Sequence, residues 1–310
     1  MIEYNSVKKK TLILILKITY KGDEDNMNIV LGASGQIGSM LVDNLLKKGQ
    51  PVRAIIRNSI KALELKNKGV EVVIADYSDM EALKKSFYGG RSIFLLTPEN
   101  PNCNNFLIET QILLNNFREA ILPSGATKIV GLSSGGAQNE SGTGNLEASY
   151  MLEHTFSDIN IEQIYVRPAY YFSNWLGYLD LVKNYGVLPT FFPPEMKVAM
   201  IAPPDVAEFL SDIMICKTRQ ERIYELTGPN LYSSLDIAKI FGDVLNRNVK
   251  VQQVLPEEWE STLIQAGFSK DGAKNLMLMT KAVIDGKTKN ETTNPIRFYT
   301  DFKKYMINMI

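Results

Sequence analysis

The sequence predicts an α/β fold in which a doubly wound parallel sheet is followed by a smaller C-terminal lobe. An apolar run at residues 28–31 leads into three glycines and then into a helical apolar pattern that ends at Gly49. Further strand-like runs alternate with helical patterns as far as residue 168, which is typical of a parallel sheet covered on both faces. Aromatic and proline residues become frequent from Ala169 onward. We therefore divide the chain into a sheet domain at 27–168 and a lobe at 169–310, and expect some lobe segments to return to the sheet.

The stretch MNIVLGASGQIG at residues 27–38 predicts a phosphate-binding turn between a strand and a helix. The first glycine lets the chain leave the strand, the second admits a phosphate close to the backbone, and the third lets the helix pack on the strand. Free N–H groups and the positive end of the helix dipole would meet the anion. The spacing is G-x-x-G-x-x-G, and a glycine-rich turn without a ligand is the alternative. The predicted phosphate-binding residues are Gly32, Ser34, Gly35, Gln36, Ile37 and Gly38.

The second strand, at residues 52–56, ends at Arg57. In a doubly wound sheet this position faces the adenosine ribose of a dinucleotide. An acidic residue there would bind the 2′-hydroxyl group, whereas an arginine can pair with a 2′-phosphate. Arg57 therefore favours NADP(H) over NAD(H). The alternative is an arginine that is simply solvated in a loop.

The sheet domain continues with expected helices at 61–68, 80–87, 104–122 and 146–156, and with expected strands at 70–75, 92–96, 128–133 and 161–166. Ligands of such sheets bind beyond the carboxyl ends of the strands. Residues 134–144 are polar and rich in glycine, so we expect a mobile loop above that edge. The further residues expected to bind the cofactor at this edge are Asp76, Tyr77, Thr97 and Pro168.

The lobe opens with a cluster of aromatic side chains directly after a sheet strand. Such a group can line an apolar pocket for a flat ligand, and plain core packing is the alternative. The residues expected at this pocket are Tyr170, Tyr171, Phe172 and Trp175. Beyond them we expect strands at 198–201, 224–227 and 249–254, and helices at 205–215, 234–245, 257–266, 270–284 and within 294–310.

Composition narrows the class of protein. The 310 residues carry no formal net charge, which argues against general attraction to nucleic acid or to a membrane surface. Two cysteines cannot form a disulfide framework, so we expect reduced thiols in a cytoplasmic protein. The single histidine excludes a histidine-rich metal site. The apolar run at residues 11–16 is too short for a membrane span. We expect residues 1–26 to be a dispensable extension.

GASGQIG at 32–38 and VRAIIRN at 52–58 resemble the NmrA-like family of atypical short-chain dehydrogenases/reductases. The segments VRPAYYFSNW at 166–175, DVAEFL at 205–210 and YELTGPNLYSSLDIAKIF at 224–241 extend the resemblance to nearly all of residues 27–286. The family implies a Rossmann domain that binds NADP(H) or NAD(H) and a smaller substrate-side lobe. Its members include quinone and isoflavone-type reductases and redox sensors that bind the nucleotide without known turnover.

The chain departs from the Tyr-x-x-x-Lys pair of standard short-chain dehydrogenases. Here the helix reads Tyr150-Met-Leu-Glu-His154, and no lysine lies between Gly131 and Tyr165. His154 could partly replace the lysine as a cation or hydrogen-bond donor, or it could lie on the helix surface. Ser133 matches the place of the family's serine after the fifth strand. The candidate proton donors are therefore Tyr150, Ser133 and His154.

Two functions follow from these residues. The first is an NAD(P)H-dependent reductase of a small, flat, apolar acceptor such as a quinone, in which hydride transfer needs mainly positioning and exclusion of water. The second is a non-catalytic sensor that reports the redox state of NADP(H) to a protein partner, with the loop at 134–144 ordering on binding. The incomplete catalytic helix motivates the second, and the complete glycine turn makes us favour the first.

Overall fold

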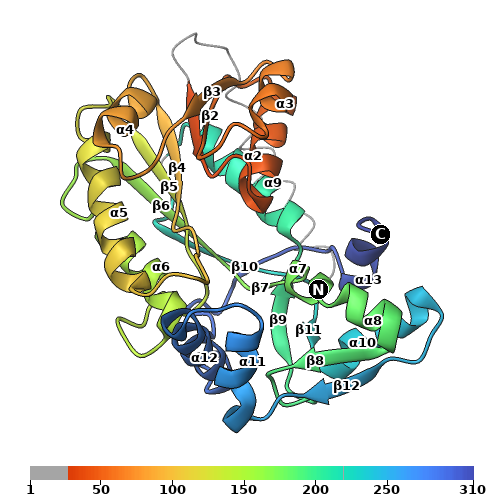
Figure 1. The fold of residues 1–310 in the computed structure, drawn as a ribbon. Helices are drawn as coiled ribbons and strands as arrows, with labels where there is room; N and C mark the ends of the chain where they lie inside the picture. Colours follow the sequence, from red (N-terminus) through yellow and green to blue (C-terminus); the bar gives the residue numbers. More distant parts are fainter. Residues whose placement is uncertain (1–26, 219) are drawn as a thin grey trace.

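The computed structural model describes residues 27–218 and 220–310, so the expectation for residues 1–26 lies outside the described residues. Its centre is a parallel sheet of eight strands in the order β13-β10-β6-β5-β4-β1-β2-β3 (Figure 1). Its strands are β1 (Asn28–Leu31), β2 (Val52–Ile56), β3 (Glu71–Ile74), β4 (Ser92–Leu96), β5 (Lys128–Leu132), β6 (Glu162–Pro168), β10 (Ile223–Thr227) and β13 (Ile296–Arg297). All pairings between neighbouring strands are parallel.

Helices cover both faces of this sheet because the strands are apolar on both sides. One face packs against α2 (Gln36–Lys47), α3 (Ala62–Asn67) and α9 (Pro203–Ile215) around the buried side chains of Leu41, Leu65 and Leu210. The other packs against α4 (Met80–Phe87), α5 (Phe106–Ile121) and α6 (Glu147–His154), which follows the 3-10 turn η1 (Gly144–Leu146). The doubly wound prediction is confirmed, and α9, β10 and β13 are the segments of the C-terminal half that join this sheet.

The C-terminal half also builds a second core beside the sheet (Figure 1). Here β7 (Tyr170–Tyr171), β9 (Val198–Ile201) and β11 (Leu231–Tyr232) form one small sheet, while β8 (Val187–Thr190) and β12 (Lys250–Gln253) form another. The ring of Phe172 packs edge-on against those of Tyr232 and Phe302. The helices here are α7 (Ser173–Leu176), α8 (Leu179–Tyr185), α10 (Ser234–Leu245), α11 (Trp259–Gln265), α12 (Lys270–Ile284) and α13 (Phe302–Ile307), with a 3-10 turn η2 (Pro256–Glu258).

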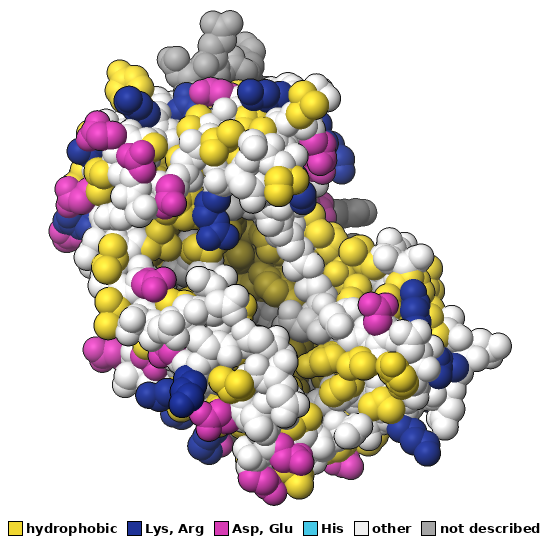
Figure 2. Space-filling view, in the orientation of Figure 1, with side chains coloured by type: hydrophobic (Ala, Val, Ile, Leu, Met, Phe, Trp, Pro, Cys, Tyr) yellow, Lys and Arg dark blue, Asp and Glu magenta, His cyan; other side chains and the backbone are white. Residues whose placement is uncertain are grey.

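The strand order fixes where a ligand can bind. From β1 the chain proceeds to β2 and β3, and it then crosses to the opposite side of β1 to form β4. A crevice opens beyond the carboxyl ends of the strands at such a switch point. Figure 2 shows a hollow at the centre of the molecule, with hydrophobic side chains on its floor. Among the helices of the described residues, none combines the length and the apolar character that a membrane crossing requires.

Candidate functional site

The turn after β1 is held in one conformation by glycine geometry and by a tyrosine. Gly32 has a φ of +61°, a backbone conformation that residues with a side chain rarely adopt. Its N–H donates a hydrogen bond of 3.0 Å to the hydroxyl oxygen of Tyr77, and its carbonyl accepts the N–H of Gly35 at 2.8 Å. A Cβ on residue 38 would lie 2.2 Å from the Gly32 carbonyl oxygen. Only glycine at 38 therefore allows α2 to start this close to the strand.

The N-terminus of α2 presents uncapped amide groups. Gly35 is its N-cap, and no side chain accepts a hydrogen bond there. The N–H groups of Gln36, Ile37 and Gly38 belong to the first turn, where a helix supplies no backbone acceptor. Gly35 has no Cβ to stand in front of them, and α2 is 12 residues long, so its dipole adds positive potential at this end. These groups match the diphosphate of a dinucleotide.

Two cations lie beside the glycine turn on the β2 side. Arg57 follows β2 directly, is exposed, and donates no hydrogen bond to another described residue. Lys61 precedes α3, and its Nζ donates to the carbonyl oxygen of Ser34 at 3.0 Å. The sequence reasoning missed Lys61, because no local pattern indicates that a lysine directly before a helix reaches back to residue 34. Arg57 and Lys61 therefore place two positive charges on the segment between β2 and α3.

Asp76 and Tyr77 have partners inside the protein. The Asp76 carboxylate accepts hydrogen bonds from the N–H and the hydroxyl group of Ser78, at 2.8 and 2.7 Å. These bonds, together with the charge of Arg57, lower the pKa of Asp76. The Tyr77 ring is buried edge-on against Phe117, 5.5 Å between centroids, and its hydroxyl group contacts the turn. Tyr77 therefore supports the glycine turn from below. Half-buried Thr97 follows β4 and makes no hydrogen bond to another described side chain.

Ser133 lies at the end of β5, but its hydroxyl group is not free. It is buried and donates to Glu153 at 2.6 Å, and Glu153 in turn forms a paired contact with Arg167. Arg167 also reaches Glu291 at 2.5 Å. Burial works against the charge of Arg167, yet Glu153 and Glu291 hold its pKa above the ordinary value. The expectation that Ser133 donates a proton to a substrate is therefore not supported by its geometry, because Glu153 accepts that hydrogen.

Tyr150 and His154 form a separate pair on α6. Their rings stack at 4.0 Å between centroids, and His154 Nδ1 lies 2.8 Å from the Tyr150 carbonyl oxygen. His154 is exposed, whereas Tyr150 is half-buried and its hydroxyl group has no hydrogen-bond partner in the described chain. The face of α6 toward the β5 end carries Ser149 and Glu153, which contact Ser134 and Ser133. The structure thus brings Tyr150 and His154 together and leaves Ser133 with other partners.

The four aromatic residues expected at a pocket have different surroundings. Phe172 is fully buried and Trp175 is 2% exposed, both inside the lobe core, so the expectation that they line an open pocket is wrong. Adjacent residues of a strand point to opposite faces. Tyr170 accordingly packs on the lobe core, and Tyr171 packs on the core beneath α2 and α9. Pro168 is buried at the end of β6, and its carbonyl oxygen accepts the N–H of Gly135 at 3.3 Å.

A hydrogen bond from the lobe reaches the first residue of α2. The Ser173 hydroxyl group, at the start of α7, donates to Gln36 Oε1 at 3.1 Å. Gln36 is the first residue of α2, directly after Gly35. The hydroxyl group of Ser173 therefore marks where the lobe approaches the N-terminus of α2.

The loop at 134–144 is anchored by the segment that follows α12. Gln138 Nε2 donates to the carbonyl oxygens of Lys287 and Lys289, both at 3.1 Å. A Cβ on Gly144 would lie 2.0 Å from the Asn275 carbonyl oxygen, which shows how closely the loop packs on α12. The loop at 134–144, which we expected to be mobile, thus makes hydrogen bonds and close contacts to the segment 275–289 in this structure.

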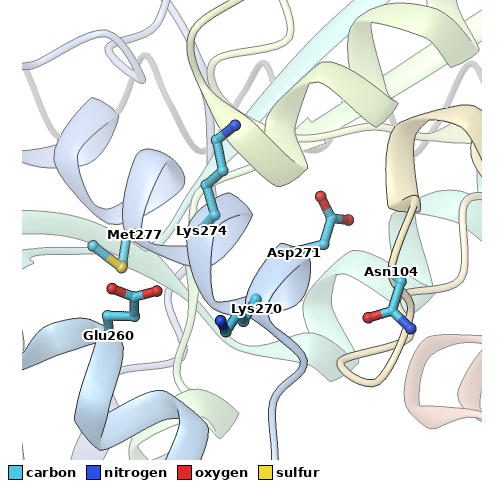
Figure 3. A pocket seen from close by; sticks show the side chains of 6 residues that line it. All are labelled: Asn104, Glu260, Lys270, Asp271, Lys274 and Met277. Atoms are coloured by element: carbon cyan, nitrogen blue, oxygen red, sulfur yellow. The ribbon is translucent and has the colours of Figure 1, made fainter.

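A separate open hollow of about 470 Å³ lies beside α12 (Figure 3). Its walls carry charged and polar side chains, and none of them belongs to the glycine turn or to the strand ends. We therefore do not place the dinucleotide there. The lining residues are Asn104, Glu260, Lys270, Asp271, Lys274 and Met277.

Comparison with known proteins agrees with this geometry. The model of the NmrA-like family matches residues 25–306. An NAD(P)H azoreductase of Xenophilus azovorans is 23% identical over 90% of this chain and 97% of its own length.

Two solved structures share the fold. A triphenylmethane reductase of Citrobacter sp. complexed with NADP(H) superposes with a TM-score of 0.76 at 22% identity, over 92% of this chain and 100% of that chain. An NADPH-dependent quinone oxidoreductase of Escherichia coli complexed with NADPH gives a TM-score of 0.75 at 21% identity, over 91% and 99% of the two chains.

Proposed function

Since this chain belongs to the NmrA-like family, we propose that it is an NAD(P)H-dependent reductase of a small, flat, apolar acceptor. The observation that carries the proposal is the uncapped N-terminus of α2, with Gly35 as its N-cap. A buried strand, a positive-φ glycine and free amide groups together form a binding site for a diphosphate.

We propose that NADP(H) is preferred over NAD(H). The position after β2 carries Arg57 and no acidic residue, and Lys61 adds a second positive charge beside the same turn. An exposed guanidinium group that donates no hydrogen bond to the described residues can form a paired contact with a 2′-phosphate. Ser78 donates both of its hydrogen bonds to Asp76 Oδ1, so Asp76 Oδ2 can still accept a hydrogen bond from the nucleotide.

The proposed acceptor is an aromatic compound such as a quinone. The relatives named above include an azoreductase, a quinone oxidoreductase and a triphenylmethane reductase. The hydrophobic floor of the central hollow supports the same class of acceptor, because apolar walls hold a flat ring and exclude water (Figure 2).

A bound reduced nicotinamide would supply the hydride, and the protein would supply position and a dry environment. Gln36, Ile37 and Gly38 would hold the diphosphate through their N–H groups. Of the three candidate donors, only Tyr150 keeps a hydroxyl group without a partner in the described chain. Ser133 we assign to the support of α6, because its hydroxyl group is bound to Glu153.

The sensor hypothesis requires a segment that reorders on nucleotide binding. The loop expected to do so is held by Gln138 and by close packing on α12. We therefore favour the reductase. A sensor would bind NADP(H) with the same residues and show no turnover with any acceptor.

The proposal is tested by following NADPH oxidation at 340 nm (the absorption of reduced nicotinamide) with a panel of quinones and azo compounds. We expect steady turnover with at least one acceptor, and a rate lower by at least about tenfold with NADH because binding energy is lost at the 2′-phosphate. The absence of turnover with every acceptor, despite tight NADPH binding, would favour the sensor.

A further inference from the structure

The Ser173 hydroxyl group reaches the N-terminus of α2 from a fixed position in the lobe. Its neighbour Phe172 is fully buried, and the Phe172 N–H donates to the carbonyl oxygen of Ile201 at 3.0 Å. Trp175, two residues further along, is also buried, and its N–H donates to the Phe172 carbonyl oxygen at 3.2 Å. The backbone at Ser173 is therefore held on both sides by buried aromatic residues, while the Ser173 side chain itself is half-buried.

Gln36 is the partner of Ser173 and the first residue of α2. In an α-helix the Cα–Cβ bonds tilt toward the N-terminus, so the Gln36 side chain is directed toward the end where the first-turn N–H groups are free. Gln36 Oε1 accepts the Ser173 hydrogen at 3.1 Å. Its Nε2 carries two hydrogens that no described residue accepts. The Gln36 amide thus presents two unused donors at the N-terminus of α2.

Tyr305 of α13 approaches Ser173 from inside the lobe. Its ring is 2% exposed and lies 5.8 Å from that of Phe172, between centroids. Its hydroxyl oxygen is buried and makes no hydrogen bond of normal geometry with the described residues. Burial raises the pKa of Tyr305, and the adjacent Ser173 hydroxyl group lowers it. A phenol that donates to Ser173 Oγ leaves the hydrogen of Ser173 for Gln36 Oε1, so Tyr305 favours the direction in which Ser173 donates.

The direction of this hydrogen bond decides what the Gln36 amide offers to an anion. An amide turned the other way would direct Oε1 toward the free N–H groups and would repel phosphate oxygens there. With Ser173 as the donor, Nε2 is the atom left for a ligand. Hydrogen bonds to a charged oxygen are roughly twice as strong as those between neutral groups. A diphosphate at this end of α2 would therefore favour the observed orientation of Gln36.

We propose that Ser173 is a positioning residue of the dinucleotide site, which holds the Gln36 amide so that Nε2 donates to the diphosphate. The inference rests on the proposed function, because it requires a dinucleotide at the N-terminus of α2. NADP(H) and NAD(H) share the diphosphate, so Ser173 and Gln36 contribute equally to the binding of both. Arg57, in contrast, acts on the 2′-phosphate that only NADP(H) carries. A residue of the lobe thereby contributes to the affinity for the cofactor.

The test is calorimetric titration of NADPH and NADH into the full chain and its variants. We expect Gln36→Met, which keeps the length and the helix propensity of the side chain, to lower both affinities about tenfold. Ser173→Ala should lower both about threefold to fivefold. In the Gln36→Met background it should have no further effect, because Ser173 acts through Gln36. Ser173→Thr keeps the hydroxyl group and should retain wild-type affinity. Ser261→Ala is the matched control, since it removes a lobe hydroxyl group that bonds within its own segment.

Wild type that binds both dinucleotides no more tightly than Ser173→Ala and Gln36→Met would overturn the inference and leave the dinucleotide site intact. Losses that add in the double variant would overturn the positioning role, and a loss confined to NADPH would overturn the diphosphate assignment. Wild type that binds neither dinucleotide would overturn the proposed function, and the inference with it. Should Ser173→Ala fail to fold, Ser173→Cys decides, because a thiol is a weak donor and should weaken both dinucleotides alike.

Discussion

The hydroxyl oxygen of Tyr77 accepts the N–H of Gly32 at 3.0 Å, so a residue that follows the third strand holds the turn after the first. Tyr77 is itself fixed by packing on Phe117. The conformation of the glycine turn is therefore stabilised by Tyr77 and Phe117 in addition to its own glycines.

Tyr77→Phe should leave the Gly32 N–H without its partner and destabilise the protein. We expect the free energy of unfolding to fall by about 0.5–1.5 kcal/mol, the range for the loss of one hydrogen bond, because this bond is part-buried. The affinity for NADPH should fall several-fold, because the turn loses its fixed position. Denaturant unfolding and calorimetric titration measure the two effects, and an unchanged stability would show that the hydrogen bond contributes nothing.

Gly38→Ala should damage the junction of β1 and α2. The new methyl group would lie 2.2 Å from the Gly32 carbonyl oxygen, so α2 must move. We expect a loss of about 1–3 kcal/mol in unfolding free energy, typical of overpacking, together with weaker NADPH binding. Gly177→Ala is the matched control, since a Cβ there meets no atom closer than 3.4 Å. Similar thermal unfolding of both variants would contradict the steric account.

Arg57→Ala should change the affinity for NADP(H) and for NAD(H) by different amounts. Affinity for NADP(H) should fall at least about tenfold, whereas affinity for NAD(H) should barely change, because only NADP(H) carries the 2′-phosphate. Lys61→Ala should weaken both to some extent, because Lys61 also anchors Ser34. Lys303→Ala, an exposed cation of α13, is the charge control. Equal losses for both dinucleotides in Arg57→Ala would remove Arg57 from the 2′-phosphate site.

Arg167→Met should destabilise the chain strongly. It leaves Glu153 and Glu225 buried near each other without their shared cation, which lies 2.6 Å from the first and 3.9 Å from the second. Removing one partner of a buried ion pair costs about 3–5 kcal/mol. Adding Glu153→Gln to Arg167→Met should recover part of that loss, because one uncompensated charge disappears. A double variant no more stable than the single one would argue against charge burial as the cause.

The sheet domain was predictable because its local signals agree. The strands β1, β2 and β4 lie at the residues that the apolar runs indicate, and the helices α4, α10 and α12 match their expected bounds. The strands of the lobe were harder to predict. β7 and β11 contain two residues each, and β8 contains Pro189, so none of them has a readable periodicity. Such strands form because neighbouring segments pair with them.

The contacts of the candidate site could be predicted only in part. The roles of the glycines could be predicted, because they follow from backbone sterics and from the spacing of glycine in the sequence. The partner of Ser133 depends on the rotation of α6, which the buried Leu152 and Phe156 determine. The partners of Arg167 lie 14 and 124 residues away, and no local pattern links them. For the same reason the sequence did not predict the hydrogen bonds by which Lys61 and Tyr77 contact the glycine turn.

Calorimetric titration of NADPH into wild type and into Gly35→Asp tests the central claim most directly. Gly35 has a φ of −83°, which other residues also adopt, and aspartate is a favourable N-cap, although a Cβ at this position would lie 3.2 Å from the Gly32 carbonyl oxygen. We predict that wild type binds NADPH with a Kd on the order of micromolar, and that Gly35→Asp loses at least about 10²-fold in affinity while the protein remains folded. Equal NADPH affinity in both proteins, or none in wild type at millimolar NADPH, would contradict a diphosphate site at the N-terminus of α2.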